Sequence, residues 1–196
     1  MVGMRRLDNL QACIETAVGD GVPGDLIETG VWRGGATIFM RGVLKALGST
    51  DRTVWVADSF QGLAPPNPAL YPDDAGDAHH EENTLRVSLE QVRPHFARFD
   101  LLDEQVQFLE GWFRDTLHVA PIEQLAVLRL DGDMYESTWQ ALGVLYPKLA
   151  VGGFAIVDDF GLPACRRAVE DYRLKHDIDE PMDQIDWTGV FWRKTK

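Results

Sequence analysis

The 196 residues can bury a sizeable core but leave little room for a second domain, and 45% hydrophobic with 26% charged residues is typical of a globular protein. The chain has 19 basic and 31 acidic residues, which give a net charge of −12. Such a surface repels nucleic acid phosphates and anionic lipid headgroups but tolerates a divalent cation, so we expect neither nucleic acid nor a membrane as a partner.

The sequence shows no targeting segment and no redox motif. No apolar run follows the arginines of the first ten residues, and none approaches the roughly 20 residues that span a bilayer. Cys13 and Cys165 lie far apart and belong to no disulfide or zinc pattern. We therefore expect a cytoplasmic protein with reduced thiols.

Apolar runs alternate with helical patterns along the chain, which predicts an α/β fold with a mostly parallel sheet. The first half predicts a helix over 6–18, a strand over 25–28 with a glycine turn over 29–35, a helix over 36–47 and a strand over 54–57. The second half predicts helices over 83–98, 136–149 and 164–176, strands over 106–109, 125–130 and 154–157, and an antiparallel hairpin over 185–193.

Residues 65–82 interrupt this alternation. They contain four prolines, several aspartates and the pair His79-His80. Long irregular segments within compact domains are usually lids or disordered insertions. We expect a lid-like insertion at about 65–82 in a single domain spanning 1–196. A base or a substrate contact from the two histidines is possible, although solvated loop histidines are more common.

Acidic residues follow four predicted strands. Glu28 ends the first, Asp58 follows the second, Asp131 follows the strand over 125–130, and Asp158 and Asp159 follow the strand over 154–157. Ligands bind outside the carboxyl ends of strands in open parallel sheets. One such aspartate can simply cap a helix, but four acidic strand ends favour a functional rim.

The glycine turn separates two classes of cofactor. A dinucleotide fingerprint needs a glycine at the middle position of G-x-G-x-x-G, where Trp32 would obstruct a pyrophosphate. The pattern is instead Glu28-x-Gly30-x-x-x-Gly34-Gly35. S-adenosylmethionine has no phosphates, and a nearby carboxylate can satisfy its ammonium group. The turn therefore favours that cofactor, with a plain tight turn as the alternative.

Two further positions fit an adenosyl cofactor. Asp58 is placed to accept hydrogen bonds from both ribose hydroxyls, a role that would also serve NAD. Trp112 follows the third strand and could lie against the adenine ring, or belong to the core. The expected cofactor-binding residues are Glu28, Thr29, Gly30, Gly34, Gly35, Asp58, Ser59, Gly111 and Trp112.

Asp131, Asp158 and Asp159 form the expected metal site. Carboxylates on adjacent strand ends repel one another unless a cation lies between them, and Mg²⁺ prefers such oxygen ligands. The cation could bind a substrate hydroxyl, lower its pKa and hold its oxygen in line with the methyl group. The alternative is that Asp158 or Asp159 caps the next helix. Asp133 and Glu136 are further acidic neighbours.

Several runs together resemble the macrocin O-methyltransferase family of antibiotic-modifying enzymes. They are GDLIETGVWRGGATIFMRGVLKA, VWVADSF, EGWFRDTL, LRLDGDMYEST, GGFAIVDDFG and IDWTGVFWRK, and the resemblance covers about residues 6–194. It implies a Rossmann-like class I methyltransferase fold, with a mostly parallel seven-stranded sheet, helices on both faces and an antiparallel C-terminal edge hairpin.

The resemblance also implies the chemistry. S-adenosylmethionine would donate the methyl group, Asp131, Asp158 and Asp159 would hold Mg²⁺, and Asp131 would double as the general base. The acceptor would be a hydroxyl of a deoxysugar or related small natural product. Family members usually carry a longer amino-terminal segment that contributes to a dimer, so a homo-oligomer is possible.

Two other functions remain open at this stage. A nicotinamide-dependent oxidoreductase is disfavoured by Trp32 and by the lack of a Tyr-x-x-x-Lys pair. A non-catalytic protein that binds S-adenosylmethionine is disfavoured by the three aspartates of the expected metal site.

Overall fold

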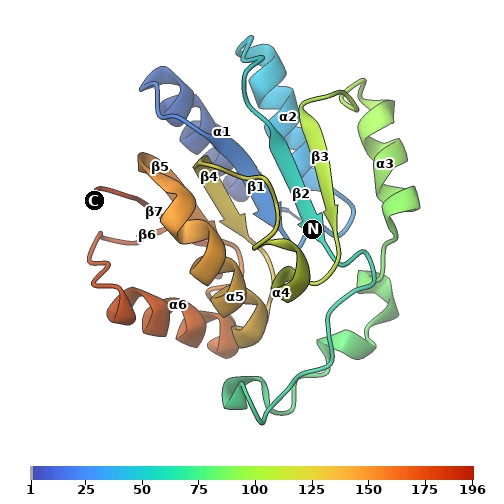
Figure 1. Ribbon diagram of the computed structural model, residues 1–196, viewed down its shortest axis with the longest axis vertical. Helices are drawn as coiled ribbons and strands as arrows, with labels where there is room; N and C mark the ends of the chain where they lie inside the picture. The colour runs from blue at the N-terminus through green and yellow to red at the C-terminus, as the bar shows by residue number, and fades with distance from the viewer. Residues whose placement is uncertain (1) are drawn as a thin grey trace.

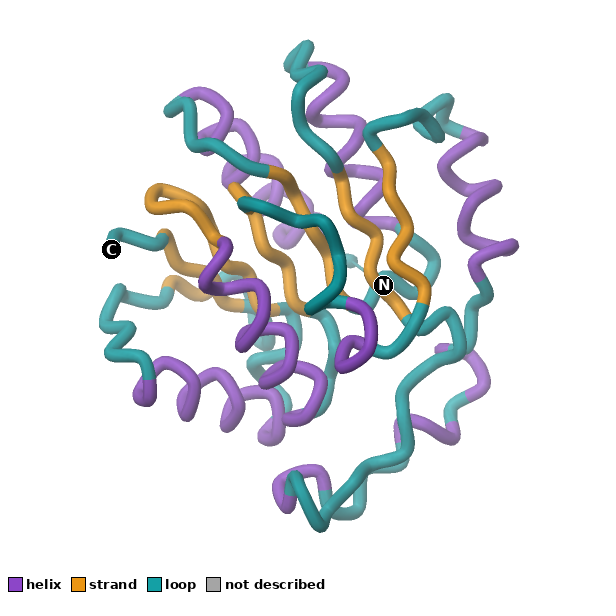
Figure 2. Tube along the Cα trace, in the orientation of Figure 1, coloured by secondary structure: helices purple, strands orange, loops and turns teal. Residues whose placement is uncertain are grey.

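A computed structural model describes residues 2–196 and contains a seven-stranded sheet with helices on both faces (Figures 1 and 2). The strands lie in the order β3-β2-β1-β4-β5-β7-β6, and β7 runs antiparallel to β5 and β6 while the other pairs are parallel. This confirms the predicted fold class. The strands are β1 (Asp25–Thr29), β2 (Val54–Asp58), β3 (Val106–Glu110), β4 (Leu125–Leu130), β5 (Leu149–Val157), β6 (Asp183–Gln184) and β7 (Val190–Arg193).

The helices form two layers around this sheet (Figure 1). One layer contains α1 (Met4–Gly19), α2 (Gly35–Ala46) and α3 (Leu89–Arg98), and the other contains α4 (Phe113–Thr116), α5 (Tyr135–Leu145) and α6 (Pro163–Lys175). Among residues 2–196, no helix is both long enough and apolar enough to cross a membrane.

Side-chain alternation along β1 explains why both faces are covered. Leu26 packs with the apolar residues of α1 and α2, whereas Ile27 packs in the cluster that includes α5 and α6. Successive side chains of a strand point to opposite faces, so a central parallel strand places apolar side chains on both faces. The two side chains are accordingly almost fully buried.

The order of the strands positions the site. The chain builds the sheet outward from β1 to β2 and β3, and then returns to place β4 on the other side of β1. Connections on either side of this switch point leave in opposite directions, which opens a crevice at the carboxyl ends of β1 and β4. The acidic strand ends predicted from the sequence lie at this edge of the sheet.

Two predicted helices have different bounds in the structure. The helix expected over 83–98 begins only at Leu89, because Ser88 and Gln91 form a capping box there. The helix expected over 136–149 ends at Leu145. Pro147 follows within a 3₁₀ turn, and β5 begins at Leu149, earlier than expected.

The segment between β2 and α3 is irregular apart from three single-turn 3₁₀ helices, which are Pro72–Asp74, His79–Glu81 and Asn83–Leu85. In Figure 1 this segment descends from the sheet and passes beneath the lower ends of α5 and α6. Contacts of the first 3₁₀ turn with both helices agree with that view.

Candidate functional site

A cavity of about 570 Å³ lies at the carboxyl ends of β1, β2, β4 and β5. It collects most of the residues expected from the sequence to bind a cofactor or a metal ion. Those that line it are Glu28, Gly30, Gly35, Asp58, Ser59, Trp112, Asp131, Asp158 and Asp159.

Three of the expected residues do not line this cavity, namely Thr29, Gly34 and Gly111. They instead take part in the backbone structure of the strand ends and turns around it. The carbonyl oxygen of Thr29 accepts a hydrogen bond from the N–H of Asp131 at 2.9 Å. Gly34 precedes α2 with φ of 80°, a conformation that favours glycine. The N–H of Gly111 donates to the carbonyl oxygen of Asp58 at 2.9 Å.

Gly30 allows the end of β1 to approach the chain after β4. Its φ is 85°, and a Cβ atom built on it would lie 1.8 Å from the carbonyl oxygen of Asp131. Any side chain at this position would collide with backbone, so the glycine is required by a close approach of two strands' ends.

Asp58 holds the glycine turn in place. One carboxylate oxygen accepts hydrogen bonds from the N–H groups of Val31 at 2.7 Å and Trp32 at 3.2 Å, and the other accepts from Phe60 at 2.8 Å. Burial raises the pKa of Asp58, and these donors oppose that shift. The predicted contact with ribose stays a prediction, because the structure accounts for this carboxylate by its role in the turn.

Glu28 presents an unpaired acceptor to the cavity. Its side chain is 2% exposed, and Oε1 accepts a hydrogen bond from Arg129. Oε2 has no hydrogen-bond partner among the described residues. Burial raises the pKa of Glu28 to about 8, although Arg129 opposes the shift. A buried acceptor without a partner costs about 1–3 kcal/mol, so this oxygen suits a donor from a ligand, such as an ammonium group.

Arg129 joins three acidic strand ends. Its side chain is 1% exposed, and its guanidinium pairs with Glu28 after β1, with Asp131 after β4 at 2.7 Å, and with Asp158 after β5. Sequence reasoning missed this residue. An arginine within the otherwise apolar run Leu125–Leu130 was the available signal, because a charge there must find partners inside the protein.

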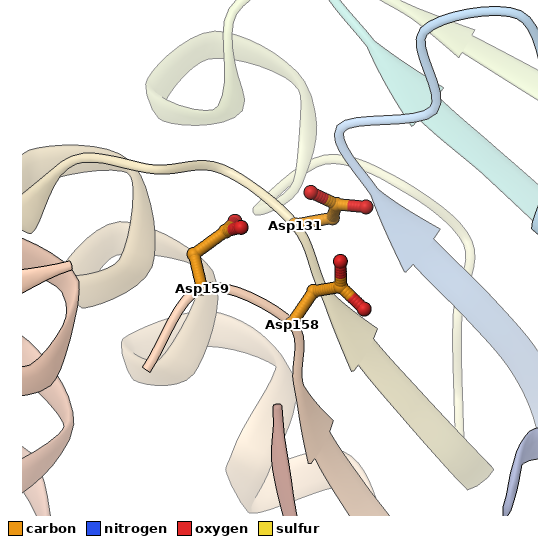
Figure 3. A group of neighbouring side chains, drawn as sticks. All are labelled: Asp131, Asp158 and Asp159. Carbon is orange, nitrogen blue, oxygen red and sulfur yellow. The ribbon is translucent and has the colours of Figure 1, made fainter. Parts of the chain in front are cut away.

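The three aspartates of the expected metal site lie together at the ends of β4 and β5 (Figure 3). Asp131, Asp158 and Asp159 each offer a carboxylate oxygen, and these oxygens lie within 4.8 Å of one another. Asp158 is also held by two arginines, because Oδ1 pairs with Arg129 and Oδ2 with Arg6. The carboxylates therefore converge as a cation site requires, with one of them fixed by neighbouring guanidinium groups.

Two carboxyl groups here titrate far from their usual range. The pKa of Asp159 is raised to about 9, first by burial and then by Asp131, Asp133 and Asp158. The pKa of Asp133 is raised to about 6, again mainly by burial. Its N–H donates to Oδ2 of Asp159 at 3.2 Å. Nearby negative charge and burial both disfavour ionisation, and a cation between these carboxylates would oppose both effects.

The histidines of the irregular segment lie outside the cavity lining. Nδ1 of His79 is 2.7 Å from Oδ2 of Asp77, and this hydrogen bond is the main reason that the pKa of His79 is raised. Asp133 raises it further. Nδ1 of His80 is buried without a hydrogen-bond partner among the described residues.

A second cavity of about 500 Å³ adjoins the first. Its lining includes the proline-rich run over 64–69 together with Trp112, Arg114 and Glu136. Because Trp112, Arg114 and Glu136 line both cavities, the two lie side by side. Lining residues of the main cavity that sequence reasoning did not single out include Arg6, Phe113, Met134, Ser137 and Gln140.

The chain is similar to known proteins over its whole length. The family profile described as Macrocin-O-methyltransferase (TylF) matches residues 1–194. An 8-demethyl-8-(2,3-dimethoxy-alpha-L-rhamnosyl)-tetracenomycin-C 4'-O-methyltransferase of Streptomyces olivaceus is 59% identical, over 100% of this chain and 75% of that protein. A demethyldecarbamoylnovobiocin O-methyltransferase of Streptomyces niveus is 56% identical, over 100% and 76%. The solved structure of the O-methyltransferase NovP superposes with a TM-score of 0.91 at 52% identity, over 100% and 81%.

Proposed function

The chain belongs to the macrocin O-methyltransferase family, and we propose that it methylates a sugar hydroxyl of a small natural product, with S-adenosylmethionine as donor and Mg²⁺ as assisting cation. It is an O-methyltransferase, and this family implies S-adenosylmethionine as the source of the methyl group. The sugar acceptor is proposed because the name of the tetracenomycin relative specifies a rhamnosyl compound.

One observation carries the proposal for the site. Glu28, whose Oε2 is a buried acceptor without a partner among the described residues, lines the same cavity as Asp131, Asp158 and Asp159. An ammonium group of the methyl donor would fit the first feature, and a divalent cation the second. The cavity can thus bring a methyl donor and a cation-bound acceptor together at adjacent strand ends.

The aspartates fit Mg²⁺ by their chemistry. Asp131, Asp158 and Asp159 supply convergent oxygens, and burial together with the neighbouring carboxylates raises the pKa of Asp159, an effect that a bound cation would oppose. When bound, the cation supplies Lewis acidity toward a hydroxyl group. Arg129 holds Asp131 and Asp158 in place. Gly30 lets the glycine turn, where the methyl donor would bind, lie close to the backbone of Asp131.

Two carboxylates are candidates for taking the hydroxyl proton. Asp131, the choice from the sequence, has one oxygen already paired with Arg129 at 2.7 Å, and it converges with Asp158 and Asp159 on the expected cation site. Asp133 lines the same cavity, and no arginine among the described residues pairs with it. We therefore propose Asp131 as a cation ligand and Asp133 as the stronger candidate for the base.

Substitutions separate these two roles. We expect Asp131→Asn to lower turnover by about 10²-fold or more and to weaken Mg²⁺ binding, because a ligand is lost. We expect Asp133→Asn to lower turnover by a similar factor while Mg²⁺ and S-adenosylhomocysteine bind as in the wild type. Calorimetric titrations and initial rates measure both effects. Full activity of Asp133→Asn would return the base role to Asp131.

The proposed donor and acceptor are tested on the wild-type protein. Isothermal titration of S-adenosylmethionine and S-adenosylhomocysteine, with and without Mg²⁺, should show binding, and NAD should show none. Demethyldecarbamoylnovobiocin and 8-demethyl-8-(2,3-dimethoxy-alpha-L-rhamnosyl)-tetracenomycin C are the first acceptors to assay. Binding of NAD alone would overturn the assignment of S-adenosylmethionine as cofactor. If neither compound is methylated, this would count against a sugar acceptor of this kind.

A further inference from the structure

Asp74 is the one buried residue between positions 61 and 86, a range that the structure describes completely. Its relative exposure is 1%, whereas its neighbours Asp73 and Ala75 are exposed. Loops are usually anchored by apolar side chains, and aspartate is almost never fully buried unless it is paired. A buried carboxylate in the middle of an exposed segment therefore calls for a specific partner.

The partner is the first turn of α5. Oδ1 of Asp74 accepts a hydrogen bond from the N–H of Tyr135 at 2.7 Å, and Oδ2 accepts from the N–H of Glu136 at 2.9 Å. The ring of Tyr71 lies beside that of Tyr135, with 6.1 Å between their centroids. These contacts fix the middle of the irregular segment to one helix end.

No side chain close to α5 in the sequence caps the first N–H groups of this helix. Met134 occupies the N-cap position and forms no side-chain cap. The first N–H groups of a helix need acceptors, and the positive end of the helix dipole favours a carboxylate. Asp74 supplies both from about 60 residues earlier in the chain.

α5 begins directly after the turn that carries the reacting carboxylates. Asp131 and Asp133 lie in this turn, and Oγ of Ser137 in α5 bonds to the carbonyl oxygen of Gly132 within it. A helix end fixed by Asp74 therefore also fixes the backbone that presents these carboxylates to the cavity.

The ends of the same segment form walls of the two cavities. Leu63, Ala64 and Leu85 line the main cavity, and the run over 64–69 lines the second one. Near its far end, the carbonyl oxygen of Thr84 accepts a hydrogen bond from Nε1 of Trp32 at 2.8 Å. The segment is thus held at its middle by Asp74 and near its end by the glycine turn.

We propose that Asp74 is a positioning residue for the acceptor: it fastens the segment over residues 62–86 to the start of α5, and so holds the cavity wall formed by Leu63, Ala64 and Leu85 relative to the turn of Asp131 and Asp133, where the acceptor would bind. The acceptor part of this inference rests on the proposed function. We expect Asp74 to affect cofactor binding little, because its side-chain hydrogen bonds go to Tyr135 and Glu136 and none reaches Glu28 or the glycine turn.

The test compares Asp74→Ala and Asp74→Asn with Asp73→Asn as the matched control. Asp73→Asn removes the same charge from the same 3₁₀ turn at an exposed position. Asp74→Ala should accelerate amide hydrogen exchange over 62–86 and at Tyr135 and Glu136. With demethyldecarbamoylnovobiocin as the probe it should raise the acceptor KM at least tenfold and change kcat less, while the Kd of S-adenosylhomocysteine stays within twofold.

The variants separate positioning from general damage. Asp74→Asn keeps one acceptor oxygen and should fall between the wild type and Asp74→Ala, whereas Asp73→Asn should match the wild type. Unchanged exchange over 62–86 in Asp74→Ala, or a KM and an S-adenosylhomocysteine Kd that rise together, would overturn the inference. A wild-type protein that does not methylate the probe would instead count against the proposed function, and the exchange data would still decide whether Asp74 fastens the segment.

Discussion

Arg129 lies where three strands bring negative charge together. It faces Glu28, Asp131 and Asp158, and Arg6 adds a second positive charge at Asp158. Buried charges are stable only when they are paired and hydrogen bonded. Because every one of these carboxylates borders the cavity, the same arginine that stabilises the fold also holds the candidate ligands at their positions.

We expect Arg129→Met to lower the free energy of unfolding by about 3–5 kcal/mol, because the buried carboxylates of Glu28 and Asp158 and the partly exposed carboxylate of Asp131 lose their shared partner. Urea denaturation followed by circular dichroism measures the loss. Arg5→Met is the matched control, since Arg5 is exposed on α1. A loss below about 1 kcal/mol, the range of exposed pairs, would show that the pairing is not a major source of stability.

Contacts between elements join the two ends of the chain at this site. Nε of Arg6 in α1 pairs with Oδ2 of Asp186, which precedes β7, at 2.7 Å. Asp186 also accepts hydrogen bonds from the N–H groups of Thr188 at 3.0 Å and Gly189 at 2.8 Å. The loop before β7 is thereby fastened to the helix that borders the cavity.

Stability at this contact should depend on pH. The hydrogen bond from Arg6 is the main reason that the pKa of Asp186 lies well below its usual range. A carboxyl group with a lowered pKa contributes stability above its unfolded pKa of about 4, and this contribution is lost as the pH falls toward its folded pKa. Asp186→Asn should therefore cost about 1–2 kcal/mol at pH 7 and clearly less at about pH 2.5, which lies well below the unfolded pKa.

Denaturant unfolding at the two pH values measures this difference. Asp183→Asn, an exposed change in the neighbouring strand β6, is the control and should show no comparable loss. An equal cost of Asp186→Asn at both pH values would mean that shape, and not charge, accounts for the contact.

The charge of the whole molecule is strongly negative, at −12. Part of this charge is concentrated at the carboxyl edge of the sheet, where burial and mutual repulsion raise the pKa of Asp159 to about 9. A divalent cation that binds only the folded chain should therefore stabilise the protein as a whole.

Mg²⁺ at about 100 times its Kd should add about 2.7 kcal/mol, and for a chain of this size each kcal/mol raises Tm by about 2–4 °C. Thermal melts with Mg²⁺, and with NaCl at the same ionic strength, measure the effect. In Asp159→Asn the shift caused by Mg²⁺ should shrink to that caused by NaCl. An equal shift by both salts in the wild type would mean that general screening acts and no specific site binds Mg²⁺.

The amino-acid sequence by itself determined the order of the strands and of the five longer helices, although not the short α4, and the acidic residues at the strand ends. These features are local: apolar periodicity reports which face of an element is buried, and Gly30 and Gly34 report backbone conformations that other residues rarely adopt. Since parallel strands align their carboxyl ends, the sequence also implied that Asp131, Asp158 and Asp159 would meet, as they do.

Only the tertiary structure decided which groups satisfy one another. Glu28 and Arg129 are 101 positions apart, and Asp74 reaches α5 across 61 positions. No periodicity encodes such pairs, because they depend on how separate elements pack. Asp58 illustrates the same limit: its predicted ligand contact stays a prediction, whereas the three N–H groups that donate to its carboxylate are seen only in the folded chain. A buried polar group forms hydrogen bonds with the groups that the folded chain places within reach, so its partners depend on tertiary packing and not on local sequence.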